Sequence, residues 1–345
     1  MKDMKKIFNI KKKFCFLLCV TLTVSLLLGC QSNRKEAVTK TGFYFDTVIS
    51  ITLYGQDKEP YIDRCFEMAR TYESYFSTTI EDSDVSRINQ HPGEAVTVHP
   101  ETAELIQKGL SYYSVSEGRF DITIGALSSL WNFSDSSGKI PEHSKIEDAL
   151  QTVNASSVLV DGDQVTLTSE GTKIDLGGIA KGYIADQMKS YLKEEGITEG
   201  TINLGGNVLV LGPKEHQETT TYSIGIQKPF SEDGSAIAVI KITDESVVTS
   251  GIYQRYFKQN GTIYHHILDS STGYPYDNGL ASVTIINQSS VDGDALSTTC
   301  FRLGLEKGME LAESLENTEA IFITTDNEIY YTSGMGTIIP FEILN

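Results

Sequence analysis

Residues 173–211 read KIDLGGIAKGYIADQMKSYLKEEGITEGTINLGGNVLVL, and the elements predicted within them indicate the fold class. A short run at 173–176 predicts a strand, and two glycines then lead into a helix that we predict over 179–195, ending before Gly196. Two further strands are predicted at 200–203 and 207–211, joined by a Gly-Gly turn too short for a parallel crossover. A helix followed by an antiparallel pair points to an α+β protein.

The same elements continue on both sides of this stretch. Upstream, the patterns predict a strand at 43–54, helices at 59–76 and 100–115, and a hairpin at 156–168. We expect one compact α+β body over 42–345 with antiparallel sheets packed by helices, because the sequence contains no internal repeat and no linker rich in Pro or Ser. The downstream predictions are strands at 222–228, 236–242, 246–249, 253–258, 262–267 and 280–287, a helix pair at about 292–316, and strands at 319–324 and 328–332.

The first 41 residues predict an export signal and a tether. Six lysines precede an apolar run at 14–28, which is too short for a full membrane span. This run ends in Leu-Leu-Gly-Cys, a bacterial lipobox pattern in which Cys30 receives lipid and becomes the first residue. The alternative is a plain anchor helix that ends by chance at Cys30. We therefore expect a signal peptide at 1–29, a polar tether at 30–41, and a body held at the outer face of the bacterial cell membrane.

Charge and cysteine content narrow the function. The formal net charge is −18, and without residues 1–29 it becomes −23. Such a chain is not a general nucleic-acid binder, which needs clustered Lys and Arg to displace counterions from phosphates. Only Cys65 and Cys300 remain in the body. An exported protein can join them in a disulfide, but both lie in apolar helical patterns that favour two buried thiols.

Two Gly-Gly turns suggest a ligand cradle. Residues 175–182, DLGGIAKG, lie at a strand-to-helix junction, where glycines admit a ligand and free N–H groups face an anion. Lys181 falls in the first helical turn, where the helix dipole disfavours a cation, so a ligand is a good reason for its presence. Residues 202–207, INLGGN, repeat the Gly-Gly turn. Neither stretch matches the motif of a Rossmann or P-loop nucleotide site, and a plain glycine-rich turn remains the alternative.

Two other segments carry reactive side chains. In DGDALSTT at 292–299, Asp294 and Thr298 are one helical turn apart and offer the oxygen ligands that Mg²⁺ prefers. We predict Asp292 as the N-cap of this helix. Adjacent histidines at 265 and 266 lie on a predicted strand and point to opposite faces, so at most one of them is expected to be functional.

Six motifs occur along the body, namely FDITIGALSSLWNF, DLGGIAKGY, INLGGN, SGIYQRYF, HHILDSSTGYP and DGDALSTT. Together they resemble a known family. They occur in the family's order and the resemblance spans about residues 41–339, so the sequence is similar to the ApbE-type FAD:protein FMN transferases. This resemblance implies an enzyme that binds FAD and Mg²⁺ and joins FMN by a phosphoester bond to a Thr or Ser hydroxyl of a target protein, releasing AMP. It also implies targets with a D-x-x-[ST]-G-A-[ST] sequence in membrane electron-transfer complexes.

The resemblance also implies site residues. Asp294, Thr298 and the backbone oxygen of Gly178 match metal ligands, and His266 is our candidate for the base, so His266 and Asp294 are the catalytic candidates. Phe45 stands where many members have Met, and Thr79 where many have Tyr. Two alternatives remain open, a Mg²⁺-dependent FAD pyrophosphatase and a non-enzymatic FAD-binding lipoprotein. The expected FAD contacts are Phe45, Thr79, Arg119, Phe120, Asp121, Asp175, Lys181 and Leu268 or its neighbour Ile267.

Overall fold

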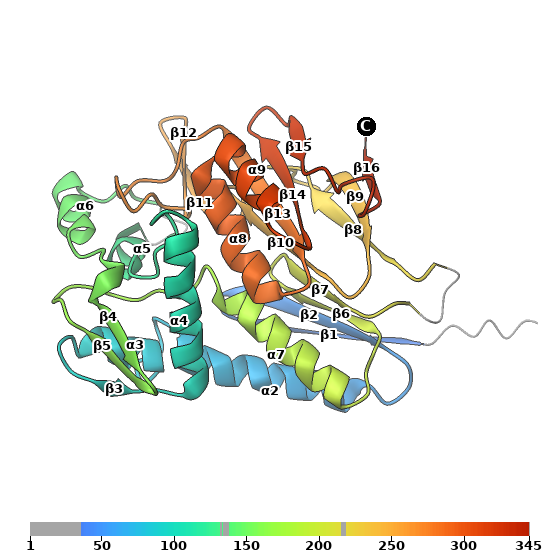
Figure 1. Cartoon of the computed structure of the whole chain (residues 1–345), viewed down its shortest axis with the longest axis horizontal. Coiled ribbons are helices and arrows are strands. Elements are labelled where there is room, and N and C mark those ends of the chain that lie inside the picture. The colour runs from blue at the N-terminus through green and yellow to red at the C-terminus, as the bar shows by residue number, and fades with distance from the viewer. Residues whose placement is uncertain (1–35, 132, 134–137, 215–218, 345) are drawn as a thin grey trace, which may run out of the picture.

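An eight-stranded antiparallel sheet forms the centre of the molecule (Figure 1). The computed structural model describes residues 36–131, 133, 138–214 and 219–344. The strand order is β1-β2-β6-β7-β10-β13-β14-β15, and every pair along it is antiparallel. The bounds are β1 Ala37–Tyr44, β2 Thr47–Tyr54, β6 Gly200–Leu204, β7 Asn207–Leu211, β10 Ser246–Gly251, β13 Leu280–Asn287, β14 Thr318–Thr324 and β15 Ile329–Tyr331.

Four helices cover one face of this sheet and a small sheet covers the other. The helices are α2 Glu59–Phe76, α7 Ala180–Glu194, α8 Ser290–Leu303 and α9 Leu305–Ser314, which contact β1 and β2, β6 and β7, β10 and β13, and β14 in turn. The small sheet has the order β16-β9-β8, with bounds β16 Phe341–Ile343, β9 Ala236–Ile242 and β8 Tyr222–Gln227.

Side chains alternate between the two faces with the period of two that a strand imposes. In β14, Ala320 and Phe322 pack under the helices, whereas Ile321 and Ile323 join the core beneath the small sheet. Because both faces are covered, β13 is buried along nearly its whole length. Two layers on one sheet therefore create two cores.

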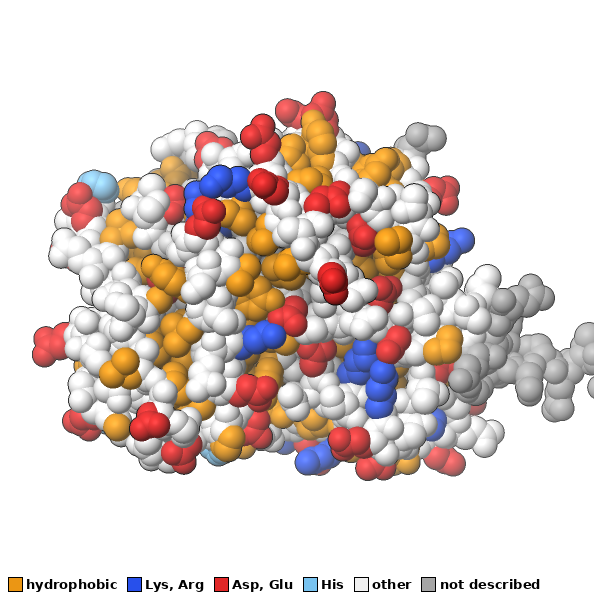
Figure 2. All heavy atoms as spheres, viewed as in Figure 1, with side chains coloured by type: hydrophobic (Ala, Val, Ile, Leu, Met, Phe, Trp, Pro, Cys, Tyr) orange, Lys and Arg blue, Asp and Glu red, His pale blue; other side chains and the backbone are white. Residues whose placement is uncertain are grey.

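The remaining elements form a lobe beside the helical face (Figure 1). A third core surrounds Trp131, which packs with Leu127, Ile146 and Leu268. In Figure 2 acidic side chains are spread over the displayed face and basic ones form small groups, in keeping with the net charge. The elements of the lobe are α3 Asp84–Gln90, β3 Val96–Thr97, α4 Pro100–Val115, α5 Gly125–Trp131, α6 His143–Leu150, the 3₁₀ turn Ala155–Ser157, β4 Val158–Asp161, β5 Gln164–Leu167, β11 Tyr256–Gln259 and β12 Thr262–His265.

The predicted helices and strands are mostly confirmed, including the hairpin at 156–168, but the N-terminal region differs. The single strand predicted at 43–54 is a hairpin of β1 and β2, and residues 37–41 of the predicted tether belong to β1. Its turn places Phe45 and Asp46 at positive φ, 53° and 54°. Such a turn usually contains Asn-Gly, and Phe45-Asp46 carries no such turn signal. Residues 1–35, with Cys30, lie outside the described part of the chain.

The structure tests three other predictions directly. The run at 173–176 is extended but forms only an isolated bridge between Lys173 and Ile124, so the predicted strand is wrong. Asp292 is not the N-cap of α8, because Ser289 takes that position and accepts a hydrogen bond from the Asp292 N–H. Cys65 and Cys300 are buried free thiols. No helix within the described residues is long and apolar enough to cross a bilayer.

Candidate functional site

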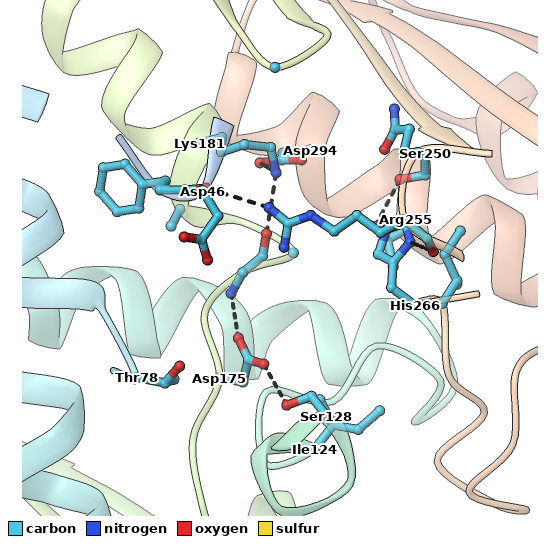
Figure 3. Close-up of a pocket in the computed structure, with 18 of the residues that line it drawn as sticks. Asp46, Thr78, Ile124, Ser128, Asp175, Lys181, Ser250, Arg255, His266 and Asp294 are labelled. Atoms are coloured by element: carbon cyan, nitrogen blue, oxygen red, sulfur yellow. Dashed lines mark hydrogen bonds and ion pairs between the residues drawn. The ribbon is translucent and has the colours of Figure 1, made fainter. Parts of the chain in front are cut away.

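A cavity of about 900 Å³ opens where the large sheet, α8 and the lobe meet. Its volume lies within the range of small-molecule sites, and all six motifs contribute to its wall. Figure 3 shows side chains from these distant segments converging on it. Among the predicted residues, Phe45, Thr79, Phe120, Asp121, Asp175, Gly178, Lys181, His266, Ile267, Leu268, Asp294 and Thr298 line the cavity.

Asp294 joins the first turns of two helices. Its Oδ2 accepts a hydrogen bond from the backbone N–H of Gly182 at 2.9 Å, and the Lys181 ammonium lies 3.6 Å from the same oxygen. A carboxylate at a helix N-terminus is stabilised by the helix dipole and by the free N–H groups of the first turn. The Asp294 carboxylate therefore supplies part of the negative charge that was expected from a ligand at the start of α7.

A backbone oxygen lies open beside this contact. Gly182 is the third residue of α7, so its N–H has no acceptor within the helix, and Asp294 supplies one. The Gly178 carbonyl accepts no backbone N–H from any described residue. One turn along α8 from Asp294, the Thr298 hydroxyl lies 3.0 Å from the Ser250 hydroxyl. A carboxylate, a hydroxyl and an open carbonyl thus face one cavity.

These donors fit a hard divalent cation held partly by substrate. No group of three His, Cys, Asp or Glu side chains suited to a metal exists in the described part of the chain. Mg²⁺ nevertheless needs no such group, since it is commonly held by one or two carboxylates together with water and phosphate oxygens. The open Gly178 carbonyl is the observation that supports the fit.

Two aspartates shape the wall near the lobe. Asp175 accepts hydrogen bonds from the Gly177 N–H at 2.8 Å and from the Ser128 hydroxyl at 2.7 Å (Figure 3). Asp121 is buried, and its Oδ1 accepts from both the N–H and the hydroxyl of Thr123. Burial raises the pKa of Asp121, whereas the bonds from Thr123 oppose that rise. Asp175 therefore positions the glycine turn, and Asp121 retains a second oxygen toward the cavity.

The two histidines separate as the strand geometry predicts. His265 is buried against Phe301, where its Nε2 meets the Tyr276 carbonyl, and burial lowers its pKa to about 4. His266 lines the cavity, and its Nδ1 lies 3.3 Å from the Arg255 carbonyl. Because a carbonyl can only accept, Nδ1 carries the proton and Nε2 keeps a free lone pair. Burial first, then Arg255, His265 and Lys181, lowers the pKa of His266 to about 3, so the ring is neutral near pH 7.

Arg119 differs from the other predicted contacts. Its guanidinium lies 3.6 Å from Glu117 and is not part of the cavity wall. Its carbonyl instead accepts a hydrogen bond from Arg302.

Two further arginines, for which the sequence predicted no role, line the cavity. Arg302 continues the spacing of Asp294 and Thr298 along α8, so that periodicity could have identified it. Arg255 donates a hydrogen bond to the Phe45 carbonyl across the cavity at 3.4 Å (Figure 3). Arg255 belongs to the SGIYQRYF motif, for which the sequence predicted no role. The contact between Arg255 and Phe45 depends on tertiary structure, so the sequence could not predict it.

A large cavity lined by Lys181, by the Asp294 carboxylate and the Thr298 hydroxyl, and by aromatic side chains defines a site for a large anionic ligand of nucleotide type. Comparison with known proteins agrees with this class. The model of the ApbE family matches residues 45–322, and the chain belongs to that family.

Relatives and solved structures agree over most of the chain. The Klebsiella pneumoniae (strain 342) protein named FAD:protein FMN transferase is 38% identical over 288 residues, which cover 83% of this chain and 88% of that one. The Treponema pallidum protein of the same name is 28% identical over 346 residues, covering 94% and 96%. The crystal structure of the Thermotoga maritima ApbE protein superposes with a TM-score of 0.79 at 32% identity, covering 86% of this chain and 97% of that one. The flavin transferase ApbE of Vibrio cholerae gives 0.77 at 27%, covering 87% and 98%.

Proposed function

We propose that this chain is an FAD:protein FMN transferase that uses Mg²⁺. A Thr or Ser hydroxyl of a target protein attacks the FMN phosphorus of bound FAD. A new P–O bond forms to that hydroxyl oxygen, the P–O bond to the AMP phosphate breaks, and AMP leaves. The observation that carries this proposal is the oxygen set of Gly178, Asp294 and Thr298 beside Lys181 in one cavity.

Phosphoryl transfer depends mainly on positioning and on charge neutralisation. Lys181 supplies one positive charge, and its ammonium is held in the cavity by Asp294 and by the Gly177 carbonyl at 3.3 Å. Gly178, Asp294 and Thr298 would hold the cation. When bound, Mg²⁺ neutralises charge on the phosphate oxygens. The hydrogen bond between Asp294 and the Gly182 N–H joins α8 to α7. It holds Lys181, Gly178 and Asp294 close together before substrate binds.

His266 is the candidate for accepting the proton of the attacking hydroxyl. Its neutral tautomer has the required lone pair on Nε2. A pKa of about 3 makes it a weak base in the free enzyme. An anionic substrate placed beside the ring favours its protonated form, so substrate binding would raise this pKa toward the working range.

The target and the cellular location extend the same proposal. We expect the acceptor to carry a D-x-x-[ST]-G-A-[ST] segment within a membrane electron-transfer protein. Lipid attached at Cys30 would hold the enzyme at the outer face of the cell membrane, near such targets. The acidic body is compatible with this arrangement because the anionic substrate meets Lys181 only inside the cavity.

The test is transfer to a purified acceptor domain. The chain is incubated with FAD, Mg²⁺ and the acceptor, and covalent flavin is detected by in-gel fluorescence. Asp294→Asn should reduce the rate by about 100-fold or more, because the charge is lost while an oxygen remains for Gly182. The exposed Asp326→Asn serves as the matched control.

Four results would contradict the proposal. FAD left intact with no flavin on the acceptor would refute the transferase. Release of FMN and AMP with no transfer would favour a pyrophosphatase, and binding without turnover would favour a flavin carrier. Full activity of Asp294→Asn would refute the assigned cation site.

A further inference from the structure

Arg302 is the third member of a row of side chains on α8. Asp294, Thr298 and Arg302 are spaced by four residues, share one face of the helix and all line the cavity. Eight residues of α-helix rise about 12 Å, so the backbone positions of Asp294 and Arg302 on α8 are about that far apart.

The guanidinium of Arg302 is enclosed but not paired with an anion. Its Nη1 donates to the Arg119 carbonyl at 2.7 Å, whereas its Nε is buried without a partner. No carboxylate forms an ion pair with Arg302 among the residues that the structure describes. Burial lowers the pKa of Arg302, although Tyr276, Asp121, Asp269 and Asp175 act in the opposite direction. The closed Nε cannot reach a ligand in the cavity, but Nη2 donates to no described residue and is not closed off, so Nη2 is the donor left for a ligand that supplies the acceptor.

The surroundings indicate what kind of ligand group belongs there. The Arg302 guanidinium lies 5.8 Å from the centre of the Phe120 ring, which is itself buried in the cavity wall. Asp121 contributes an oxygen, Oδ2, that accepts no hydrogen bond from any described residue, since both Thr123 donors bond Oδ1. An aromatic face, a planar donor and a carboxylate acceptor match a flat heteroaromatic ring whose edge carries an acceptor beside a donor.

We propose that Arg302 binds the ring end of the dinucleotide, donating to a ring acceptor while Asp121 accepts from the neighbouring ring donor. This inference rests on the proposed function and adds a positioning residue to it. Adenine offers such an edge through its amino group and ring nitrogens, and flavin offers one through its imide N–H and carbonyls. The recognised chemistry is shared by both rings, so the experiment must distinguish them.

Three probes separate the two rings from the phosphates. Binding of AMP, FMN and inorganic pyrophosphate is measured by calorimetry with Mg²⁺, for the full chain and for Arg302→Met. We expect affinity for one of the two nucleotides to fall about tenfold or more, while the other nucleotide and pyrophosphate change less than about twofold. Loss with AMP assigns adenine, and loss with FMN assigns flavin. Unchanged binding of all three, or an equal loss with pyrophosphate, would overturn the proposal.

Kinetics and further variants complete the test. The KM for FAD of Arg302→Met should rise about tenfold with kcat nearly unchanged, since the ring is bound equally in ground and transition states. Arg302→Lys should recover binding only in part, because an ammonium lacks the two-donor edge. If loss of the Arg119 contact unfolds the Met variant, the Lys variant carries the same test. Lys307→Met is the control, because its exposed ammonium pairs with Glu117 at 3.1 Å.

The test of Arg302 and the test of the proposed function can fail independently. A wild-type chain that binds none of the probes and transfers no flavin would refute the proposed function. A wild-type chain that transfers flavin, with Arg302→Met indistinguishable from it, would refute only the role of Arg302.

Discussion

Gly182 offers a decisive test of how the two helices create the site. Replacing Gly182 by Ala inside a helix should stabilise the protein by up to about 1 kcal/mol if helix propensity alone decides the outcome. The structure predicts the opposite. A Cβ on Gly182 would lie 2.3 Å from the Ser290 carbonyl oxygen and 2.6 Å from the Val291 Cα. Both are backbone atoms, so no side-chain rotation relieves the overlap and α8 must move away from α7.

The magnitude follows from two losses. Overpacking of this kind costs about 1–3 kcal/mol. Moving α8 also weakens the bond from the Gly182 N–H to Asp294, and a hydrogen bond to a charged group contributes about 1.5–3 kcal/mol. Against a gain of about 1 kcal/mol from propensity, we expect a net destabilisation of about 2–5 kcal/mol.

Urea unfolding, followed by circular dichroism, measures this change, with Gly293→Ala as the matched control. Gly293 lies on the neighbouring helix α8, but there a Cβ would meet only the Val248 side chain at 3.0 Å. That control should lose less stability than Gly182→Ala. Equal or greater stability of Gly182→Ala relative to the wild-type chain would show that the close approach of α7 and α8 is not as described.

Three further predictions concern charge, pH and thiols. Lys181→Met should lower kcat for flavin transfer by roughly 100-fold with the fold intact, measured by transfer kinetics and thermal melting. The folded-state pKa values of His265 (about 4) and His266 (about 3) lie below the ordinary 6.5, so the unfolded chain binds protons first as pH falls. The free energy of unfolding should therefore decline as the pH falls from 6.5 toward 4, by about 3 kcal/mol for His265 alone. Urea titrations at several pH values measure this decline, and it should be smaller in His265→Gln. Cys65 and Cys300, whose pKa values burial raises to about 12, should react with iodoacetamide only after unfolding, and rapid labelling of the native chain would contradict this.

The sequence predicted those parts of the fold that follow from repeating patterns. The spacing of apolar residues predicted helices α2, α4 and α7 and most strands of the large sheet, because each of these elements buries one face. Short elements such as α3 and α5 contain seven residues each and give no clear period. The β1–β2 turn was missed because Phe45 and Asp46 adopt positive φ without the usual glycine.

The site was predictable where chemistry is local and not where it depends on tertiary contacts. Spacing placed Asp294 and Thr298 on one helix face, and strand alternation separated His265 from His266. No pattern could show that the Asp294 carboxylate reaches a helix 112 residues earlier in the chain. The same spacing extends to Arg302, but an arginine near a helix end usually faces solvent or the last carbonyls, so the spacing by itself did not assign Arg302 to the site.

Asp294 couples the stability of the fold to the formation of the site. Its Oδ2 binds the first turn of α7 beside the open Gly178 carbonyl, and its other oxygen would be available to the proposed cation. Removing the side chain with Ala would leave the buried Gly182 N–H without its partner, so lost activity would be mixed with lost stability. Asn keeps an oxygen for that N–H and removes only the charge. The comparison of Asp294→Asn with Asp294→Ala therefore separates the contribution of the charge to transfer from the contribution of the bond to folding.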